Sequence, residues 1–311
     1  MSLLVLGLLG LVALIHATWN VILKTSGDPL RTSGRAMVAG VLASLPFALV
    51  AWLLAGAPPV PPEALVLAVA SGLLETVYFV FLSAAYRRGD LSVVYPIARG
   101  TAPLFAVAAG VLVLGEHLGL VGGLGVAGLA AGMLLVQQPW RAIGRLRSGA
   151  GNGGRAAGGR GGVPGVGRAI DRATLFALAT GLTIAAYSAV DSVGAKLVAP
   201  WLFGALLFPV TAVSLVFWIR FVDRAPVGAG ADWPRASFAG VIALGGYLLV
   251  LVAYTLAPLT VVAPLRESAV VLVSGWGSFR LGEARDARDA ARRLIGALLI
   301  VAGALALTLD R

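Results

Sequence analysis

The sequence predicts an all-α integral membrane protein with ten transmembrane helices, arranged as two inverted five-helix repeats. Three observations support this prediction. Of the 311 residues, 59% are hydrophobic and 12% are charged, and the mean hydropathy is +0.93, whereas soluble domains carry about 25% charged residues. Long apolar runs recur along the chain, and the second half repeats a segment of the first.

The apolar runs are long enough to be membrane spans. A transmembrane helix needs roughly 20 apolar residues to cross about 30 Å of hydrocarbon. Breaks rich in glycine, proline and charge separate ten such runs, at 3–23, 33–54, 64–86, 92–114, 119–137, 173–196, 201–222, 236–257, 260–281 and 290–309. The alternation typical of β-barrel strands is absent. The apolar N-terminus lacks the basic start of a signal peptide, so we expect an uncleaved first helix.

The repeat is clearest in two segments. Residues 93–116 read VVYPIARGTAPLFAVAAGVLVLGE, and residues 261–283 read VVAPLRESAVVLVSGWGSFRLGE. Pro96 and Pro264 coincide at an offset of 168 positions, and both segments end in Leu-Gly-Glu. Because five spans is an odd number, the second half should be inserted upside down. The predicted parts are a repeat at 1–137, a flexible Gly- and Arg-rich linker at 138–172, and a repeat at 173–311.

The basic residues are distributed unevenly about the predicted membrane. Twenty of the 24, among them Arg31, Arg87 and Arg88, lie on one side, only Lys196 and Arg311 lie on the other, and Arg99 and Arg266 lie within spans. The positive-inside rule makes the basic side cytoplasmic, which puts both termini outside, and this side should attract anionic lipid headgroups. Topology thus explains the net charge of +10, and no nucleic acid is expected. The alternative is an RNA contact through GGRGG in the linker.

Span one carries a polar stripe. His16, Trp19, Asn20 and Lys24 recur at i, i+3, i+4 and i+8, which places them on one helix face. Polar groups in hydrocarbon have to meet other helices or water. His16, Trp19 and Asn20 are therefore candidates for a binding site. The alternatives are interfacial anchoring by Trp19 and Lys24, and hydrogen bonding between helices.

Span three places a carboxylate near the membrane centre. Glu75 shares a helix face with Ser71 and Tyr78. An ionised carboxylate at that depth costs about 2.5–3.5 kcal/mol, so it has to be paired, hydrated or protonated. We expect Glu75 to bind a solute or to exchange a proton. The alternative is a static partner for Arg99 or Arg266.

The repeated segments hold prolines beside ionisable residues. Pro96 removes a backbone donor near Arg99, and broken helices of this kind build substrate sites between inverted repeats. Arg266 and Glu267 follow Pro264 in the second copy. Glu267 is the repeat counterpart of Arg99, so direct pairing of these two side chains is a hypothesis.

Span six carries a second stripe, with Thr180, Thr183, Tyr187 and Asp191 at i, i+3, i+7 and i+11. Tyr187 and Asp191 are candidates for the site. The alternative for Asp191 is a water-exposed carboxylate at the helix end, paired with Lys196. In span eight, Tyr247 and Tyr254 share a face, where they either line a cavity or pack.

No cofactor, metal or catalytic residue is predicted. Span five matches G-x-G-x-x-G from Gly123 to Gly128, but no strand-turn-helix unit accompanies it. Close packing of helices at Gly128 and Gly132 explains the glycines better. The chain has two histidines and no cysteine, and no metal-ligand spacing is present.

Several of these segments resemble the EamA-type transporters of the drug/metabolite transporter superfamily. They are HATWN followed by lysine, YPIARGTAP running to LGE, and VAPLRE running to a second LGE. The resemblance covers nearly the whole chain. It implies a ten-helix inverted-repeat transporter that exports amino acids or other small metabolites across the bacterial inner membrane by alternating access. Relatives often have cytoplasmic termini, whereas the charge distribution here favours the opposite.

The predicted function is transport of a small polar or amphipathic solute, with an amino-acid-like solute favoured and proton coupling as an option. The substrate-binding candidates are His16, Trp19, Asn20, Glu75, Tyr78, Tyr95, Arg99, Tyr187, Asp191, Arg266 and Glu267. In this hypothesis Arg99 or Arg266 holds an anionic group, Glu75 holds an ammonium group or a proton, and aromatic side chains form the walls.

Two other classes of protein are alternatives. A polytopic membrane enzyme would need a clustered acid, base or metal site, for which the sequence offers little support. A membrane scaffold would have little reason to keep ionisable groups at the bilayer centre on several helices.

A monomer is favoured, because two halves already make a complete carrier, and a dimer is the alternative.

Overall fold

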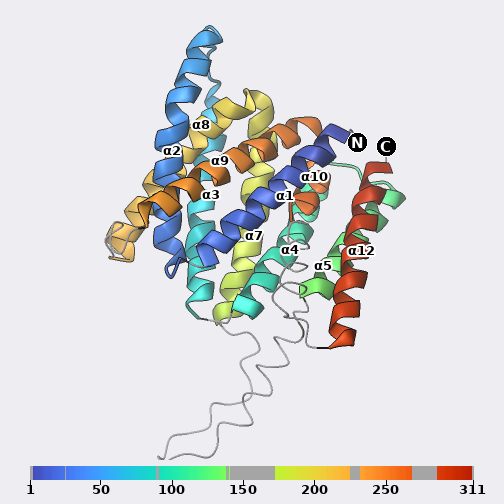
Figure 1. Cartoon of the computed structure of the whole chain (residues 1–311). Coiled ribbons are helices and arrows are strands. Elements are labelled where there is room, and N and C mark those ends of the chain that lie inside the picture. The colour runs from blue at the N-terminus through green and yellow to red at the C-terminus, as the bar shows by residue number, and fades with distance from the viewer. Residues whose placement is uncertain are drawn as a thin grey trace, which may run out of the picture.

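The structure is a computed structural model of the chain, in which residues 3–24, 26–88, 91–137, 140, 172–224, 232–267 and 286–309 are described. Within these ranges all regular secondary structure is helical, and turns and irregular segments connect the helices (Figure 1). The helices are α1 (Leu3–Lys24), α2 (Pro29–Leu54), α3 (Pro62–Tyr86), α4 (Leu91–Leu112), α5 (Leu120–Gln137), α7 (Arg172–Leu197), α8 (Pro200–Phe217), the π-helical turn η1 (Trp218–Val222), α9 (Trp233–Leu256), α10 (Leu259–Glu267) and α12 (Ala287–Leu309).

The composition of these helices is that of a multi-pass membrane protein. Among the described helices, α2, α3, α7, α9 and the continuous pair α8 and η1 are long and apolar enough to cross a bilayer. Helices α1, α4 and α5 contain shorter apolar stretches. Large apolar side chains such as Phe47 and Leu54 point outward and are exposed, which is the arrangement expected where lipid covers the surface.

Helices occupy the predicted ranges, and two of the starts that lie earlier than predicted have a local cause. Helix α2 begins at Pro29, before the predicted start at 33, because the Asp28 side chain accepts from the Arg31 N–H at 3.1 Å. Helix α9 begins at Trp233, before the predicted start at 236, because Asp232 accepts from the Arg235 N–H at 3.2 Å. Of the predicted span 260–281, the part after α10 lies outside the described residues.

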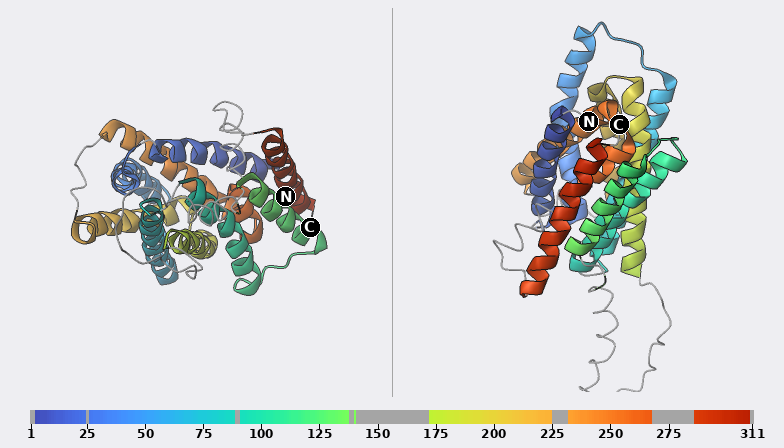
Figure 2. Two further views of the ribbon diagram at one scale, coloured as in Figure 1. Left: turned by 90° about the horizontal axis from the view of Figure 1, so that it is seen from below. Right: turned by 90° about the vertical axis from the view of Figure 1, so that its right-hand side faces the viewer.

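Helices from the two predicted halves lie against one another. Helices α3 and α4 pack on α7, while α1 and α2 pack on α9 (Figures 1 and 2). Helix α10 lies beside α4. The beginning of α1 and the end of α12 lie at the same end of the molecule in both figures. The division into 1–137, 138–172 and 173–311 stays a prediction, and residues 141–171 of the linker lie outside the described part.

The glycines of α5 pack against α12, as predicted from the sequence. A Cβ added at Gly132 would collide with the backbone oxygen of Gly296, and one at Gly303 would collide with that of Gly125. Small residues let helices in a membrane approach this closely. A packing role therefore explains the G-x-G-x-x-G match without a dinucleotide.

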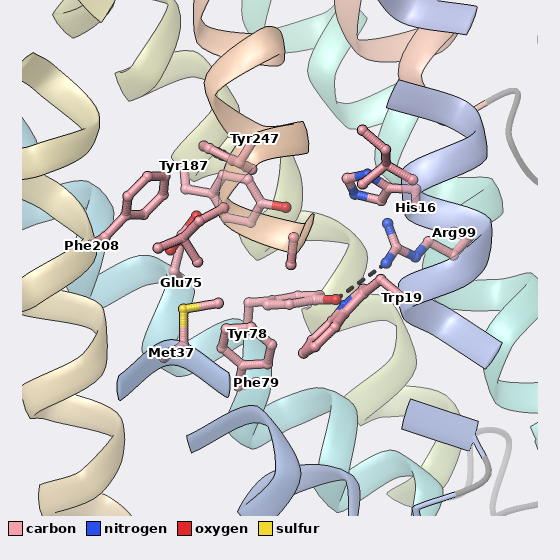
Figure 3. Close-up of a pocket in the computed structure, with 13 residues that line it drawn as sticks. His16, Trp19, Met37, Glu75, Tyr78, Phe79, Arg99, Tyr187, Phe208 and Tyr247 are labelled. Carbon is pink, nitrogen blue, oxygen red and sulfur yellow. Dashed lines mark hydrogen bonds between the residues drawn. The ribbon is translucent and has the colours of Figure 1, made fainter. Parts of the chain in front are cut away.

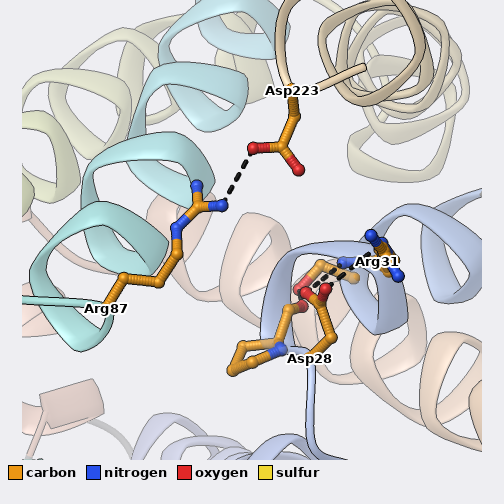
Figure 4. Close-up of polar contacts among 6 residues, drawn as sticks. Asp28, Arg31, Arg87 and Asp223 are labelled. Atoms are coloured by element: carbon orange, nitrogen blue, oxygen red, sulfur yellow. Dashed lines mark hydrogen bonds and ion pairs between the residues drawn. The ribbon is translucent and has the colours of Figure 1, made fainter. Parts of the chain in front are cut away.

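Two ion pairs involve residues that the sequence assigned to the basic side. The Arg87 guanidinium lies 2.8 Å from the Asp223 carboxylate and links the end of α3 to the end of η1 (Figure 4). The Arg31 and Asp28 side chains are 3.2 Å apart at the start of α2. Pairs exposed at a surface contribute at most about 1 kcal/mol each, so they orient these helix ends more than they stabilise the fold.

Candidate functional site

A small cavity lies inside the bundle, between helices of both predicted halves (Figure 3). Its volume is about 50 Å³, which leaves room for about four water molecules. It is lined by Ile15, His16, Trp19, Met37, Glu75, Tyr78, Phe79, Arg99, Tyr187, Phe208, Ala243, Leu244 and Tyr247.

Charged groups of opposite sign lie on opposite sides of this cavity. Figure 3 shows Arg99 near His16 and Trp19 on one side, and Glu75 near Tyr187 and Tyr247 on the other. Arg99 is 4% exposed and Glu75 is 6% exposed. A bound solute would thus meet a cationic and an anionic group, both shielded from bulk water.

Arg99 is oriented by an aromatic neighbour. Its Nη2 donates a hydrogen bond to the Tyr78 hydroxyl at 3.2 Å. Tyr78 also packs edge-on against Tyr187, with 5.9 Å between the ring centroids. These contacts join α3, α4 and α7, so Tyr187 from the second predicted half packs against the tyrosine that orients the guanidinium.

Glu75 is held by a hydroxyl group from α8. The Thr211 hydroxyl donates to Glu75 Oε2 at 2.9 Å, and Thr211 itself is fully buried. A buried carboxylate without such a donor would carry a large desolvation cost. Thr211 therefore helps to keep Glu75 at the cavity wall.

Asp191 lies behind the cavity wall. It is fully buried and accepts hydrogen bonds from the hydroxyls of Ser71 and Tyr247. The alternative of a water-exposed carboxylate at the helix end is wrong, because Asp191 is completely enclosed, whereas Lys196 is exposed. Asp191 instead orients Tyr247, whose ring lines the cavity.

Arg266 supplies positive charge to the same interior. It is 1% exposed, its Nη2 donates to the Ser188 hydroxyl at 3.3 Å, and its guanidinium lies 5.7 Å from the centre of the Tyr187 ring. Its charge acts on both Glu75 and Asp191, and the charge of Asp191 acts on Glu75. One guanidinium thus partly offsets two buried carboxylates.

The structure brings together six of the predicted site residues at the cavity: His16, Trp19, Glu75, Tyr78, Arg99 and Tyr187. Asp191 and Arg266 do not line it but contact residues that do. The side chains of Asn20, Tyr95 and Glu267 lie outside the described part, so pairing of Arg99 with Glu267 stays a hypothesis.

Sequence reasoning left out several residues of the site. Tyr247 had been assigned either to a cavity or to packing, and the hydrogen bond to Asp191 shows why it faces the interior. Thr211 is a polar residue in an apolar span, and this feature could have indicated that its side chain faces the protein interior. Met37, Phe79 and Phe208 also line the cavity, and no sequence signal distinguishes them from core residues. Among the described residues, no group of His, Asp and Glu has the arrangement of a metal site.

Buried ionisable groups around a cavity in an apolar helical bundle are typical of membrane transporters. Residues 3–137 match the model of the EamA-like transporter family. This segment makes up less than half of the chain, and the match agrees with the sequence resemblance.

The structural comparison extends over nearly the whole chain. One solved structure, described only as "Crystal structure of protein", is similar with a TM-score of 0.65 and 20% sequence identity, over 97% of this chain and 95% of that one. At this identity the likeness shows a shared fold. No curated protein matches the chain.

Proposed function

We propose that this chain is a secondary transporter of a small zwitterionic, amino-acid-like solute. The observation that supports this proposal most is the cavity between Arg99 and Glu75, in which two buried groups of opposite charge face the same small space. An amino acid carries the complementary pair of charges.

Each end of the solute has a chemically matched partner. A guanidinium binds a carboxylate through charge-assisted hydrogen bonds, which are roughly twice as strong as neutral ones, so Arg99 takes the solute carboxylate. Glu75 takes the ammonium group. The faces of Trp19, Tyr78 and Tyr187 complete the cavity wall, where aromatic rings attract a nearby cation.

The transport mechanism that we propose is alternating access. Ten membrane spans in two inverted repeats would rock about the central cavity, and the volume of about 50 Å³ fits a closed state that admits only a small solute. Rearrangement of Met37, Phe79 and Phe208 would open it further. Export is the favoured direction, as the family resemblance implies.

Proton coupling would follow from the position of Glu75. A carboxylate that faces the cavity can hold either a proton or the solute ammonium group, but not both. If the two compete for Glu75, solute and proton cross the membrane in opposite directions. Asp191 is separated from the cavity by Tyr247, so we assign the exchange to Glu75.

The proposed setting is the bacterial inner membrane, with both termini outside and anionic lipids against the basic side. The start of α1 and the end of α12 lie at the same end of the bundle, which supports an even number of membrane crossings. A single chain holds both sides of the cavity, so a monomer suffices.

The proposal is tested by transport assays in proteoliposomes with radiolabelled neutral amino acids. The wild type should accumulate unchanged solute, which also separates a carrier from an enzyme. Arg99→Gln should abolish uptake, while Arg88→Gln, at an exposed position, should retain it. Recovery of modified product, or equal uptake by wild type and Arg99→Gln, would contradict the proposal.

A further inference from the structure

The Leu-Gly-Glu ending of the first repeated segment has no role in the site described above. Glu116 follows a tight turn in which Gly115 has a φ of +66°, a conformation that glycine adopts readily. The Glu116 N–H donates to the Gly110 carbonyl at 2.9 Å and closes this turn. The turn directs the Glu116 side chain back toward the second half of the chain.

The Glu116 carboxylate binds the first turn of α10. Its Oε1 accepts from the Leu259 N–H at 2.7 Å, and its Oε2 accepts from the Thr260 N–H at 2.8 Å. These residues are more than 140 positions away in the sequence. The first N–H groups of a helix have no partner within it, and a negative charge is favourable there.

Helix α10 has no cap of its own that could replace this contact. The preceding residues are Ala257 and Pro258, whose side chains accept no hydrogen bond. The Pro258 carbonyl receives the Val261 and Val262 N–H groups, which leaves those of Leu259 and Thr260 to Glu116. By contrast, α2 and α9 are capped by their own Asp28 and Asp232.

A second observation shows that α4 and α10 are built to meet here. A Cβ added at Gly110 would lie 2.6 Å from Thr260 Cγ2 and 2.7 Å from Glu116 Oε2. Real Cβ atoms essentially never come so close to their neighbours. Only glycine at position 110 allows the carboxylate and the start of α10 to occupy their places.

The start of α10 determines where Arg266 lies. Arg266 follows Leu259 by seven residues, or roughly 10 Å along a helix, and it is buried against Ser188 and the ring of Tyr187. A displaced first turn would move the guanidinium away from Ser188 and from the ring of Tyr187, which lines the cavity.

We infer that Glu116 is a positioning residue of the transport site: it caps α10 from the other half of the chain and thereby sets the place of Arg266 behind the cavity wall. Its effect on transport rests on the proposed function, whereas the cap itself does not.

The cap is tested by hydrogen–deuterium exchange of the purified protein. In Glu116→Ala, the amides at the start of α10 should exchange about tenfold faster, the scale expected for a lost helix cap. Gly110→Ala should accelerate the same amides by displacing the contact. Glu63→Ala is the matched control, because Glu63 is an exposed carboxylate in the first turn of α3. Unchanged exchange at 259–260 in both Glu116→Ala and Gly110→Ala would overturn the inference.

The positioning role is tested by the kinetics of amino-acid uptake. In Glu116→Ala, the factor by which the apparent KM rises should be about ten times the factor by which the maximal rate per folded molecule falls. Glu116→Gln keeps one acceptor and should recover part of the affinity. Faster exchange with an unchanged KM would overturn the positioning role. If the wild type transports no amino acid, the proposed function fails, and the exchange data still decide the cap.

Discussion

Glu75 and Asp191 are two buried carboxylates whose partners give them different roles. Glu75 faces the cavity, and the hydroxyl groups of Thr211 and Tyr247 both interact with its carboxylate. Asp191 receives two hydroxyl hydrogen bonds, from Ser71 and Tyr247, and is closed off from the cavity. Of the two carboxylates, Glu75 is the one that lines the cavity, which is why the proposed function assigns it the solute or the proton, while Asp191 holds a wall residue in place.

Glu75→Gln tests the first of these roles. Loss of the charge removes the partner of the solute ammonium group, so uptake should fall at least tenfold, which corresponds to about 1.4 kcal/mol. The response of uptake to pH should also flatten, because glutamine does not titrate. Uptake measured across a pH series tests both expectations, with Glu63→Gln as the control at an exposed position. A variant with the wild-type rate and pH profile would rule out Glu75 as the exchanging group.

Tyr247→Phe tests the second role. It removes a hydroxyl that donates to a fully buried carboxylate, and an unsatisfied buried acceptor costs about 1–3 kcal/mol. The melting temperature in detergent should fall, and Ser71→Ala should act in the same direction through the other carboxylate oxygen. If both variants melt like the wild type, the Asp191 hydrogen bonds do not stabilise the fold.

At the scale of helices, close packing depends on which glycines face a neighbour. Gly132 of α5 touches the α12 backbone at Gly296, whereas an added Cβ at Gly123 in the same helix would meet nothing within 4 Å. The two positions are alike in sequence and differ only in what lies opposite them. This difference makes them a matched pair for substitution.

Gly132→Ala should destabilise the protein by about 1–3 kcal/mol, the usual cost of overpacking. Gly123→Ala should leave stability unchanged or raise it, because alanine favours a helix by up to about 1 kcal/mol over glycine. Thermal unfolding in detergent compares the two. Equal melting temperatures would show that α5 and α12 do not pack through this face.

The sequence predicted helices better than it predicted their ends. Apolar runs located the helices, but α2 and α9 start earlier because Asp28 and Asp232 cap them outside those runs. The ionisable residues in the spans pointed to Glu75 and Arg99 at the cavity. The sequence did not show which buried carboxylate faces the cavity and which lies behind its wall. The position of Asp191 depends on hydroxyl groups that other helices contribute.

At the scale of the whole molecule, helices from both predicted halves surround one cavity. Helices α3 and α4 from the first half pack on α7 from the second, and α1 and α2 pack on α9. Each charged side of the cavity is therefore supported by helices from both halves, for example Glu75 by Thr211 of α8. A relative movement of the halves would change the cavity directly, which is what alternating access requires.

Membrane orientation is testable at this scale because the chain has no cysteine. An impermeant thiol reagent added to intact cells should label Lys196→Cys, on the side with few basic residues. It should label Arg88→Cys only after the cells are permeabilised. Both native positions are exposed, so accessibility within the fold does not separate them. The reverse labelling pattern would place both termini in the cytoplasm.

The most direct test of the central claim is equilibrium binding of three related solutes to the purified protein, measured as a thermal shift. The solutes are a neutral amino acid, the amine without its carboxylate and the N-acetyl derivative without its ammonium charge. If Arg99 and Glu75 hold the two ends of the solute, only the amino acid should stabilise the wild type, and Arg99→Gln should no longer distinguish it from the amine. Equal stabilisation of the wild type by all three solutes would contradict a binding site defined by these two charges.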